Sequence, residues 1–219
     1  MASRQIFDKA LIELQQDILR MASLVEQAIY ESVESLMKQD VTLAAQVIMG
    51  DETIDSLYWE IEAKIIKLIA TQQPMAKDLR IVITGIKILV SLERMADHAV
   101  DIARSTMCLS GRPFKVEAVR NIPKMGELAQ QMLKDGLDAY VHGDVEKARE
   151  MCAGDDEVDY IFDKVFRELM ACMKKDPDMV VQGSYLLYVS RYLERIADHA
   201  TNIGEAVVYL VTGERRELN

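Results

Sequence analysis

Two stretches of the sequence repeat one another along nearly their whole length. Residues 92–102 read LERMADHAVDI, and residues 193–203 read LERIADHATNI. The likeness extends upstream, where GDETID at 50–55 corresponds to GDDEVD at 154–159. A chance likeness of composition would not keep register over so long a span, and repetition at a fixed period indicates duplicated structural units. The chain is therefore predicted to contain two copies of one domain.

The predicted boundary between the copies lies near Gly111-Arg112-Pro113, which gives domains at 1–111 and 112–219. The number of residues between a segment in the first copy and its counterpart in the second is slightly different for the upstream segments and for the later motif. We expect this length difference to lie in the loops around Pro74 and Pro177, because proline disfavours helical backbone at the residue before it.

Each copy is predicted to form three helices. Apolar residues recur at steps of three and four, the pattern of a helix with one buried face. Gly50 and Gly154 leave two possibilities, since each glycine either lies within a long helix or breaks it. The predicted fold class is all-α, with two tandem antiparallel three-helix bundles related by internal duplication. In the first copy, the expected first helix passes through Leu11 to Leu36 and is followed by a break at Gln39-Asp40. The second passes through Ile48 to Ile69 and ends at Gln73-Pro74, and the third runs from near Pro74 to about Leu109. The second copy repeats this over roughly 115–142, 144–174 and 178–212.

The formal net charge of −10 excludes some classes of partner. A strongly acidic protein does not neutralise phosphates, so nucleic acids and anionic membrane surfaces are disfavoured. No run is apolar for the ~20 residues that a membrane-spanning helix needs, and Arg80 and Lys87 interrupt the best candidate, 79–92. The N-terminus lacks the apolar run of a signal peptide. We expect a cytoplasmic protein that contacts membranes only through partners.

Acidic residues at four-residue spacing form a face on the third helix of each copy. Glu93, Asp97 and Asp101 continue an apolar stripe in the first copy, so they are expected near the core rather than on a fully solvated surface. Acids at the same spacing occur on each second helix. If the second and third helices are neighbours, four or five carboxyl groups converge in each copy. The corresponding residues are Glu194, Asp198 and Asn202 on the last helix, Asp51 and Asp55 on the second helix of the first copy, and Asp155 and Asp159 in the second copy.

Like charges so close together destabilise a fold unless something neutralises them. Protons, Arg94 or Arg195, or a metal ion could do so, and carboxylate bundles suit iron, manganese or zinc. The alternative is that these acids form ordinary exposed ion pairs. His98 and His199 lie ~100° round the helix from the preceding aspartates and are expected to pack or cap rather than ligate.

Motifs for common enzyme chemistry are missing from the sequence. It has no glycine-rich phosphate loop, no Gly-x-Ser-x-Gly turn and no Cys/His pair at ligand spacing. The Glu-x-x-His motif of di-iron oxidase bundles is also absent, because Glu93 and His98 are five residues apart. We therefore predict no enzymatic activity and no organic cofactor.

The sequence resembles the PhoU family, bacterial regulators of phosphate uptake and phosphate-starvation signalling. The matching segments are QPMAKDLR at 73–80, LERMADHAVDI at 92–102 and Tyr192–Glu205 in the second copy. The duplicated layout covers essentially the whole chain. The resemblance implies two three-helix bundles, a homodimer and a non-catalytic adaptor. The implied partners are the ATPase of the phosphate ABC transporter and the sensor histidine kinase of the phosphate regulon, held in its repressing state when phosphate is plentiful.

The resemblance also implies metal sites, because some relatives bind iron or zinc clusters through the acidic motifs. Asp101 departs from the asparagine usual at its position. Two other functions remain open: a metal-binding helical enzyme or metal-storage protein, and a purely structural scaffold. The ligands implied by position are Asp51, Asp55, Glu93, Asp97 and Asp101 in the first copy, and Asp155, Asp159, Glu194, Asp198 and Asn202 in the second, with iron or zinc first and manganese next.

Overall fold

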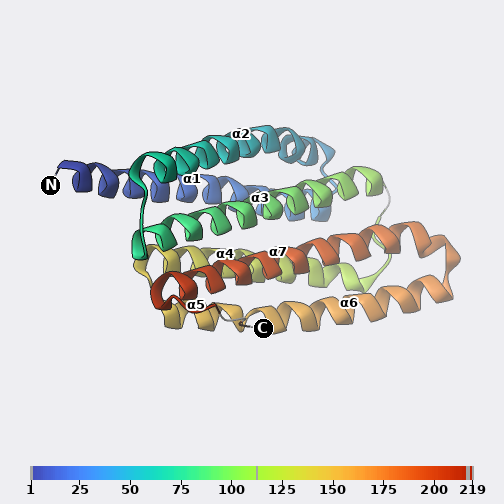
Figure 1. Cartoon of the computed structure of the whole chain (residues 1–219). Helices are drawn as coiled ribbons and strands as arrows, with labels where there is room; N and C mark the ends of the chain where they lie inside the picture. Colours follow the sequence, from blue (N-terminus) through green and yellow to red (C-terminus); the bar gives the residue numbers. More distant parts are fainter. Residues whose placement is uncertain (1, 112, 216–217, 219) are drawn as a thin grey trace.

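The computed structural model describes residues 2–111, 113–215 and 218. The described residues contain α-helices and 3₁₀-helices and no strand, which confirms the predicted all-α class (Figure 1). Helices α1, α2 and α3 form one antiparallel bundle. The second bundle consists of α4, α7 and the pair α5 and α6, which together take the place of α2. The elements are α1 (Ala2–Lys38), α2 (Val41–Gln72), α3 (Lys77–Leu109), η1 (Glu117–Asn121), α4 (Ile122–His142), α5 (Val145–Cys152), α6 (Asp155–Lys175), η2 (Pro177–Met179) and α7 (Val180–Thr212).

The same side-chain cap begins the second helix of both copies. Asp40 accepts hydrogen bonds from the backbone N–H groups of Thr42 (2.9 Å) and Leu43 (3.0 Å). Asp144 accepts one from the N–H of Lys147 (3.0 Å). Such caps satisfy backbone donors that have no partner within the helix. The repeat therefore preserves the residue that starts this helix.

The loop between the second and third helices differs in length between the copies, as predicted. Residues 73–76 separate α2 from α3, and Gln73 and Ala76 both have positive φ. In the second copy, Asp176 alone separates α6 from η2, which leads directly into α7. The shorter connection accounts for the change of offset between the repeats.

The two glycines of the repeated GD motif behave differently. Gly50 lies inside the continuous helix α2, whereas Gly154 lies in the break between α5 and α6. A Cβ atom on Gly50 would meet no heavy atom within 4 Å. A Cβ atom on Gly154 would lie 3.1 Å from the carbonyl oxygen of Met151 and 3.2 Å from Cγ of Met132. The break is therefore packed tightly against α4, and only the second copy needs glycine for space.

Alanine at these two glycines is expected to change stability in opposite directions. Gly50→Ala should raise the free energy of unfolding by about 0.5–1 kcal/mol, because glycine inside a helix costs that much relative to alanine. Gly154→Ala should lower it by about 1 kcal/mol, because the new methyl group crowds a backbone oxygen that cannot move aside. Chemical denaturation of both variants measures the two changes. Shifts of the same sign would contradict this account.

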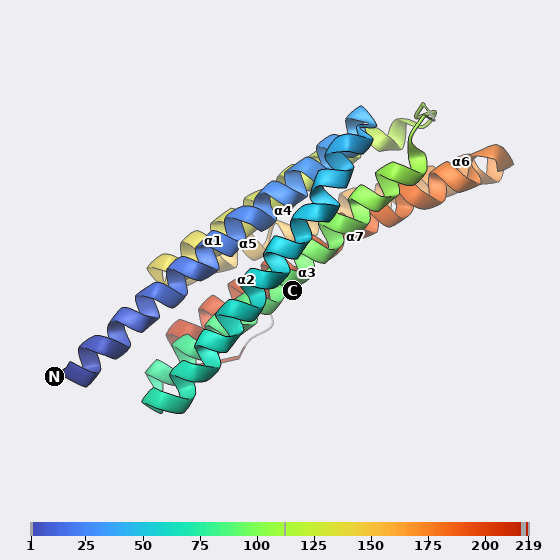
Figure 2. The same ribbon diagram turned by 90° about the horizontal axis from the view of Figure 1, so that it is seen from above.

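Helices α3 and α7 join the two bundles into a single core. They run antiparallel against one another, and α1 lies along α4 (Figure 2). The predicted boundary falls at residue 112, which lies outside the described residues. The division into domains 1–111 and 112–219 stays a prediction, and the two halves share one hydrophobic cluster.

The repeated histidines meet at this crossing. The rings of His98 and His199 stack with their centroids 5.8 Å apart, and His98 also stacks on Tyr192 at 5.7 Å. Burial, followed by repulsion from His98 and Arg195, lowers the pKa of His199 to about 4. The histidines are therefore neutral at physiological pH and serve as packing groups, in agreement with their place on the helix.

No helix in the described part of the chain is both long enough and apolar enough to cross a membrane.

Candidate functional site

The predicted acids of the first copy converge from α2 and α3. Burial raises the pKa of Asp51, and the charges of Asp55, Asp97 and Asp101 raise it further. Burial also raises the pKa of Glu93, with added contributions from Asp97, Asp55 and Asp51. Each carboxylate thus lies in the field of acids from the neighbouring helix. We call these five residues the first acidic face.

Arginines on α3 neutralise part of the first acidic face. Arg94 lies 3.3 Å from Glu93 through Nε and 3.1 Å from Asp97 through Nη1. Arg104 lies 3.1 Å from Asp101. The three acidic side chains are partly exposed, so these pairs contribute little stability. Arg94, one of the neutralising groups considered from the sequence, forms ion pairs with two of these acids. Arg104 was not anticipated, although it follows Asp101 by three residues.

Two further residues at the edge of the first acidic face were also missed. The hydroxyl of Tyr58 donates a hydrogen bond to Glu62 at 3.4 Å. Burial and the nearby charges of Glu62 and Glu93 raise the pKa of Tyr58. Both residues lie one and two helical turns beyond Asp55 on α2, and that spacing is the signal that could have found them.

Glu194 is a buried carboxylate of the second copy. Its residue is 7% exposed, and Arg191 donates a hydrogen bond to its Oε1. Its Oε2 is buried and has no hydrogen-bond partner among the described residues. Burial first, then the charges of Asp198 and Asp159, raise the pKa of Glu194 to about 7. This carboxyl group therefore titrates near neutral pH.

The second copy gathers a smaller set of acids than the first. Asp159 has a raised pKa because of burial and the charge of Asp198, and Arg195 lies 3.0 Å from Asp198. Asp155 is buried in the first turn of α6, where a helix favours negative charge. Asn202 is exposed. We call Asp159, Glu194 and Asp198 the second acidic face; it is not equivalent to the first.

The acidic faces match metal binding in chemistry but not in the present side-chain arrangement. Carboxylate oxygens suit hard and borderline cations, and Glu194 offers a buried oxygen to which no described residue forms a hydrogen bond. However, in residues 2–111, 113–215 and 218, no three Asp, Glu, His or Cys side chains are grouped so that they could hold a metal ion. Arginines occupy the positions beside these carboxylates. A metal ion would have to displace these ion pairs.

Comparison with known proteins gives consistent results over the whole chain. The sequence model of the PhoU domain matches residues 18–106 and 122–207. A phosphate-specific transport system accessory protein PhoU homolog of Clostridium acetobutylicum is 44% identical over 218 residues, which cover 99% of both chains. A homolog of the same name from Aquifex aeolicus is 40% identical and covers 94% of this chain and 93% of its own.

Solved structures show the same fold. The crystal structure of PhoU from Pseudomonas aeruginosa superposes with a TM-score of 0.91 at 32% identity, over 95% of this chain and all of that one. The phosphate transport system regulatory protein PhoU of Streptococcus pneumoniae gives a TM-score of 0.89 at 32% identity, over 96% and 99%. With its duplicated bundles and the matching domain in each copy, the chain belongs to the PhoU family.

Proposed function

We propose that this protein is a cytoplasmic, non-catalytic regulator of phosphate transport and phosphate-starvation signalling. In this role it links the ATPase of the phosphate ABC transporter to the sensor histidine kinase and holds the kinase in its repressing state when phosphate is plentiful. The observation that carries the proposal is the 44% identity, over 99% of both chains, to a protein named as an accessory of the phosphate-specific transport system. We also expect a homodimer.

The acidic faces support an adaptor role on physical grounds. Their carboxylates are crowded, partly exposed and only partly neutralised by arginines of the same helix. Basic groups on a partner would relieve this repulsion, so charge complementarity would favour association and set its orientation. Burial raises the pKa values of Asp51 and Glu93, and the charges of the neighbouring acids raise them further before any partner binds.

Deletion of the gene tests the proposed function. We expect a deletion strain to express phosphate-scavenging phosphatases in phosphate-rich medium, because the kinase would no longer be held in its repressing state. A plasmid copy of the gene should restore repression. Phosphatase activity is measured in rich and poor phosphate. Unchanged phosphatase expression in the deletion strain would argue strongly against the proposal.

Metal binding at the acidic faces is a second candidate function, favoured by the buried Oε2 of Glu194, which has no hydrogen-bond partner in the part of the chain that the structure describes. Asp159, Glu194 and Asp198 would hold a cation in the second copy, and the first acidic face would hold one in the first. The cation would neutralise the crowded carboxylates there. A metal-binding enzyme or a metal-storage protein would use the same residues.

Iron, zinc or manganese is expected to raise the melting temperature of the purified protein. A ligand that binds only the folded state stabilises it by an amount that grows with the ligand concentration relative to its Kd. The measurement is a thermal melt with each metal and with a chelator, together with elemental analysis. A melting temperature that none of these changes would count against metal binding.

A further inference from the structure

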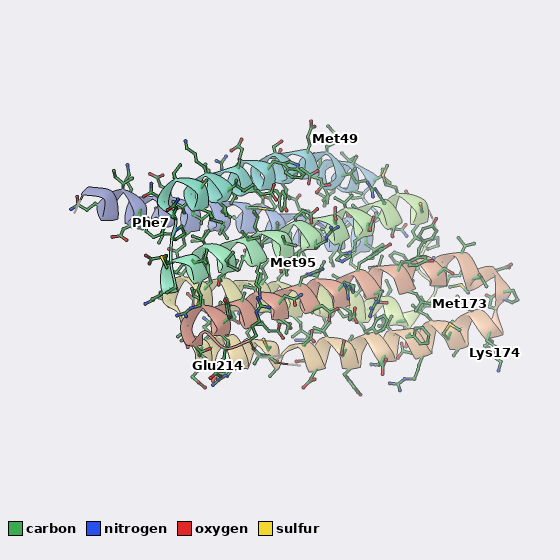
Figure 3. The ribbon with its side chains drawn as sticks, in the orientation of Figure 1. Phe7, Met49, Met95, Met173, Lys174 and Glu214 are labelled. Atoms are coloured by element: carbon green, nitrogen blue, oxygen red, sulfur yellow. The ribbon has the colours of Figure 1, made fainter. Side chains whose placement is uncertain are left out.

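Helix α2 is apolar on two opposite faces. Its inner face carries Ile54, Ile61 and Ile65, which are buried against α1 and α3. The opposite face points away from the rest of the molecule, along its edge, as Met49 does in Figure 3. Trp59 and Ile66 on that face are 63% and 60% exposed. We call this face the outer stripe of α2; its residues are Val41, Ala45, Ile48, Trp59, Ala63, Ile66 and Ala70. Ala45 and Ile48 are partly buried, and Ile48 packs against a small buried cluster at the N-terminal end of the helix.

The spacing of the outer stripe is that of a helix-packing seam. Its residues recur at steps of three and four from Val41 to Ala70, with Glu52 and Ser56 at the two middle positions. This repeat places them in one line along about four heptads, which is how a helix presents itself to a second helix. Large side chains alternate with alanines, and such a surface accepts the side chains of a partner helix between its own.

The second copy provides an internal comparison. Helix α6 corresponds to the C-terminal two-thirds of α2, and its residues at the stripe positions are mostly charged. Asp163 stands where α2 has Trp59, Arg167 where it has Ala63, and Lys174 where it has Ala70. A helix face in contact with water is expected to be polar. The apolar residues are therefore particular to α2 and are not needed by the three-helix unit itself.

The charges within and beside the outer stripe, Glu52 and Glu60 respectively, indicate the chemistry of its partner. Glu52 and Glu60 are exposed on α2, and among the described residues neither forms an ion pair. The stripe and its borders carry Glu52, Asp55 and Glu60 against a single exposed base, Lys67. A second copy laid along the stripe would therefore bring an excess of carboxylates together within a protein of net charge −10, and like charges at an interface oppose association. An anionic membrane would be repelled in the same way. Basic residues flanking an apolar helix face would be attracted.

We propose that the outer stripe of α2 is the docking surface for an amphipathic helix of a partner protein. The apolar face of that helix packs on Trp59 and Ile66, and its flanking Lys or Arg residues pair with Glu52 and Glu60. Exposed tryptophan surrounded by smaller apolar residues is a frequent energetic centre of such interfaces. This surface adjoins the first acidic face, because Asp55 lies one helical turn before Trp59 and the ring of Tyr58 contacts that of Trp59 at 5.1 Å. Its test does not depend on phosphate signalling.

Trp59 is the only tryptophan of the sequence, so its fluorescence reports on this surface directly. The probe is a synthetic amphipathic helix of about four heptads with leucine at the seam positions and lysine beside them. Adding it to the full-length protein should shift Trp59 emission to shorter wavelength, because the indole leaves water. A peptide with the same seam and glutamate in place of lysine should bind at least about tenfold more weakly.

Variants at matched positions of the two copies decide whether the peptide uses the outer stripe. Ile66→Glu should weaken binding by about tenfold or more, since it places a charge in the seam. Met170→Glu, at the corresponding exposed position of α6, should leave binding unchanged. Both residues face outward, so both variants should melt as the wild type does.

Three results would overturn the proposal. The first is equal binding of the lysine and glutamate peptides, and the second is equal binding to Ile66→Glu and to the wild type. The third is a change in the molar mass of Ile66→Glu measured by light scattering, because it would show that a second copy of this chain covers the stripe. An unchanged mass supports a partner of different sequence.

Discussion

Glu194→Gln is expected to stabilise the metal-free protein at pH 8 and to have little effect at pH 4. The carboxyl group of Glu194 is buried beside Asp198 and Asp159, and its pKa rises from 4.5 to about 7. At pH 8 the folded protein must therefore hold a buried charge with one oxygen that has no hydrogen-bond partner among the described residues. Glutamine keeps the shape of the side chain and carries no charge.

The sign follows from the protons bound in each state. Below pH 4.5 the carboxyl group is protonated in both the folded and the unfolded protein, so it has no effect on stability. Between pH 4.5 and about 7 the unfolded chain loses this proton first, so the free energy of unfolding falls as the pH rises. Above pH 7 the full penalty is present. Allowing for the lost ion pair with Arg191, we expect a gain of about 1–2 kcal/mol for Glu194→Gln.

Urea denaturation in the presence of a chelator, at several pH values between 4 and 8, measures this gain. Glu60→Gln is the control, because it removes an exposed carboxylate from a helix without a described ion pair. The stability difference between Glu194→Gln and the wild type should grow with pH. A difference that stays constant over this range, or a loss of stability at pH 8, would show that the pKa of Glu194 is not raised in the folded protein.

The repeat and the helical periodicity predicted most of the fold. The break at Gln39-Asp40 depends on a local cap, and the loop after Gln73 depends on a nearby proline, so both can be read from neighbouring residues. The shared direction of the acids on α2 and α3 was also predictable. Residues four apart lie on one face of their own helix. The contribution of Asp97 to the raised pKa of Asp51 shows that the acidic faces of α2 and α3 meet.

Contacts between residues far apart in the sequence determine the features that the repeat and the helical periodicity could not predict. Gly50 and Gly154 stand in the same motif, but Gly154 breaks its helix where Met132 of α4 packs against it. The burial of Glu194 likewise depends on how α6 packs on α7 and cannot be read from its spacing. The stacking of His98 on His199 joins residues far apart in the chain, and it required the antiparallel crossing of α3 and α7.

Removing the acids at the centre of the first acidic face is expected to abolish regulation without unfolding the protein. Burial raises the pKa of Glu93, and repulsion from Asp97 and from Asp55 and Asp51 on α2 raises it further. The double variant Glu93→Ala with Asp97→Ala relieves that repulsion and loses only partly exposed ion pairs with Arg94. Its melting temperature should therefore stay close to that of the wild type. A partner or cation attracted by these carboxylates would lose its main point of attachment.

The control variant is Glu13→Ala with Glu150→Ala, which removes the same number of charges from exposed positions on α1 and α5. Each protein is expressed in the deletion strain, and phosphatase activity is measured in phosphate-rich medium. We expect the control to repress the phosphatase and the acidic-face variant to leave it at the level of the deletion strain. Full repression by the folded acidic-face variant would contradict a regulatory role for this face and would favour a purely structural scaffold.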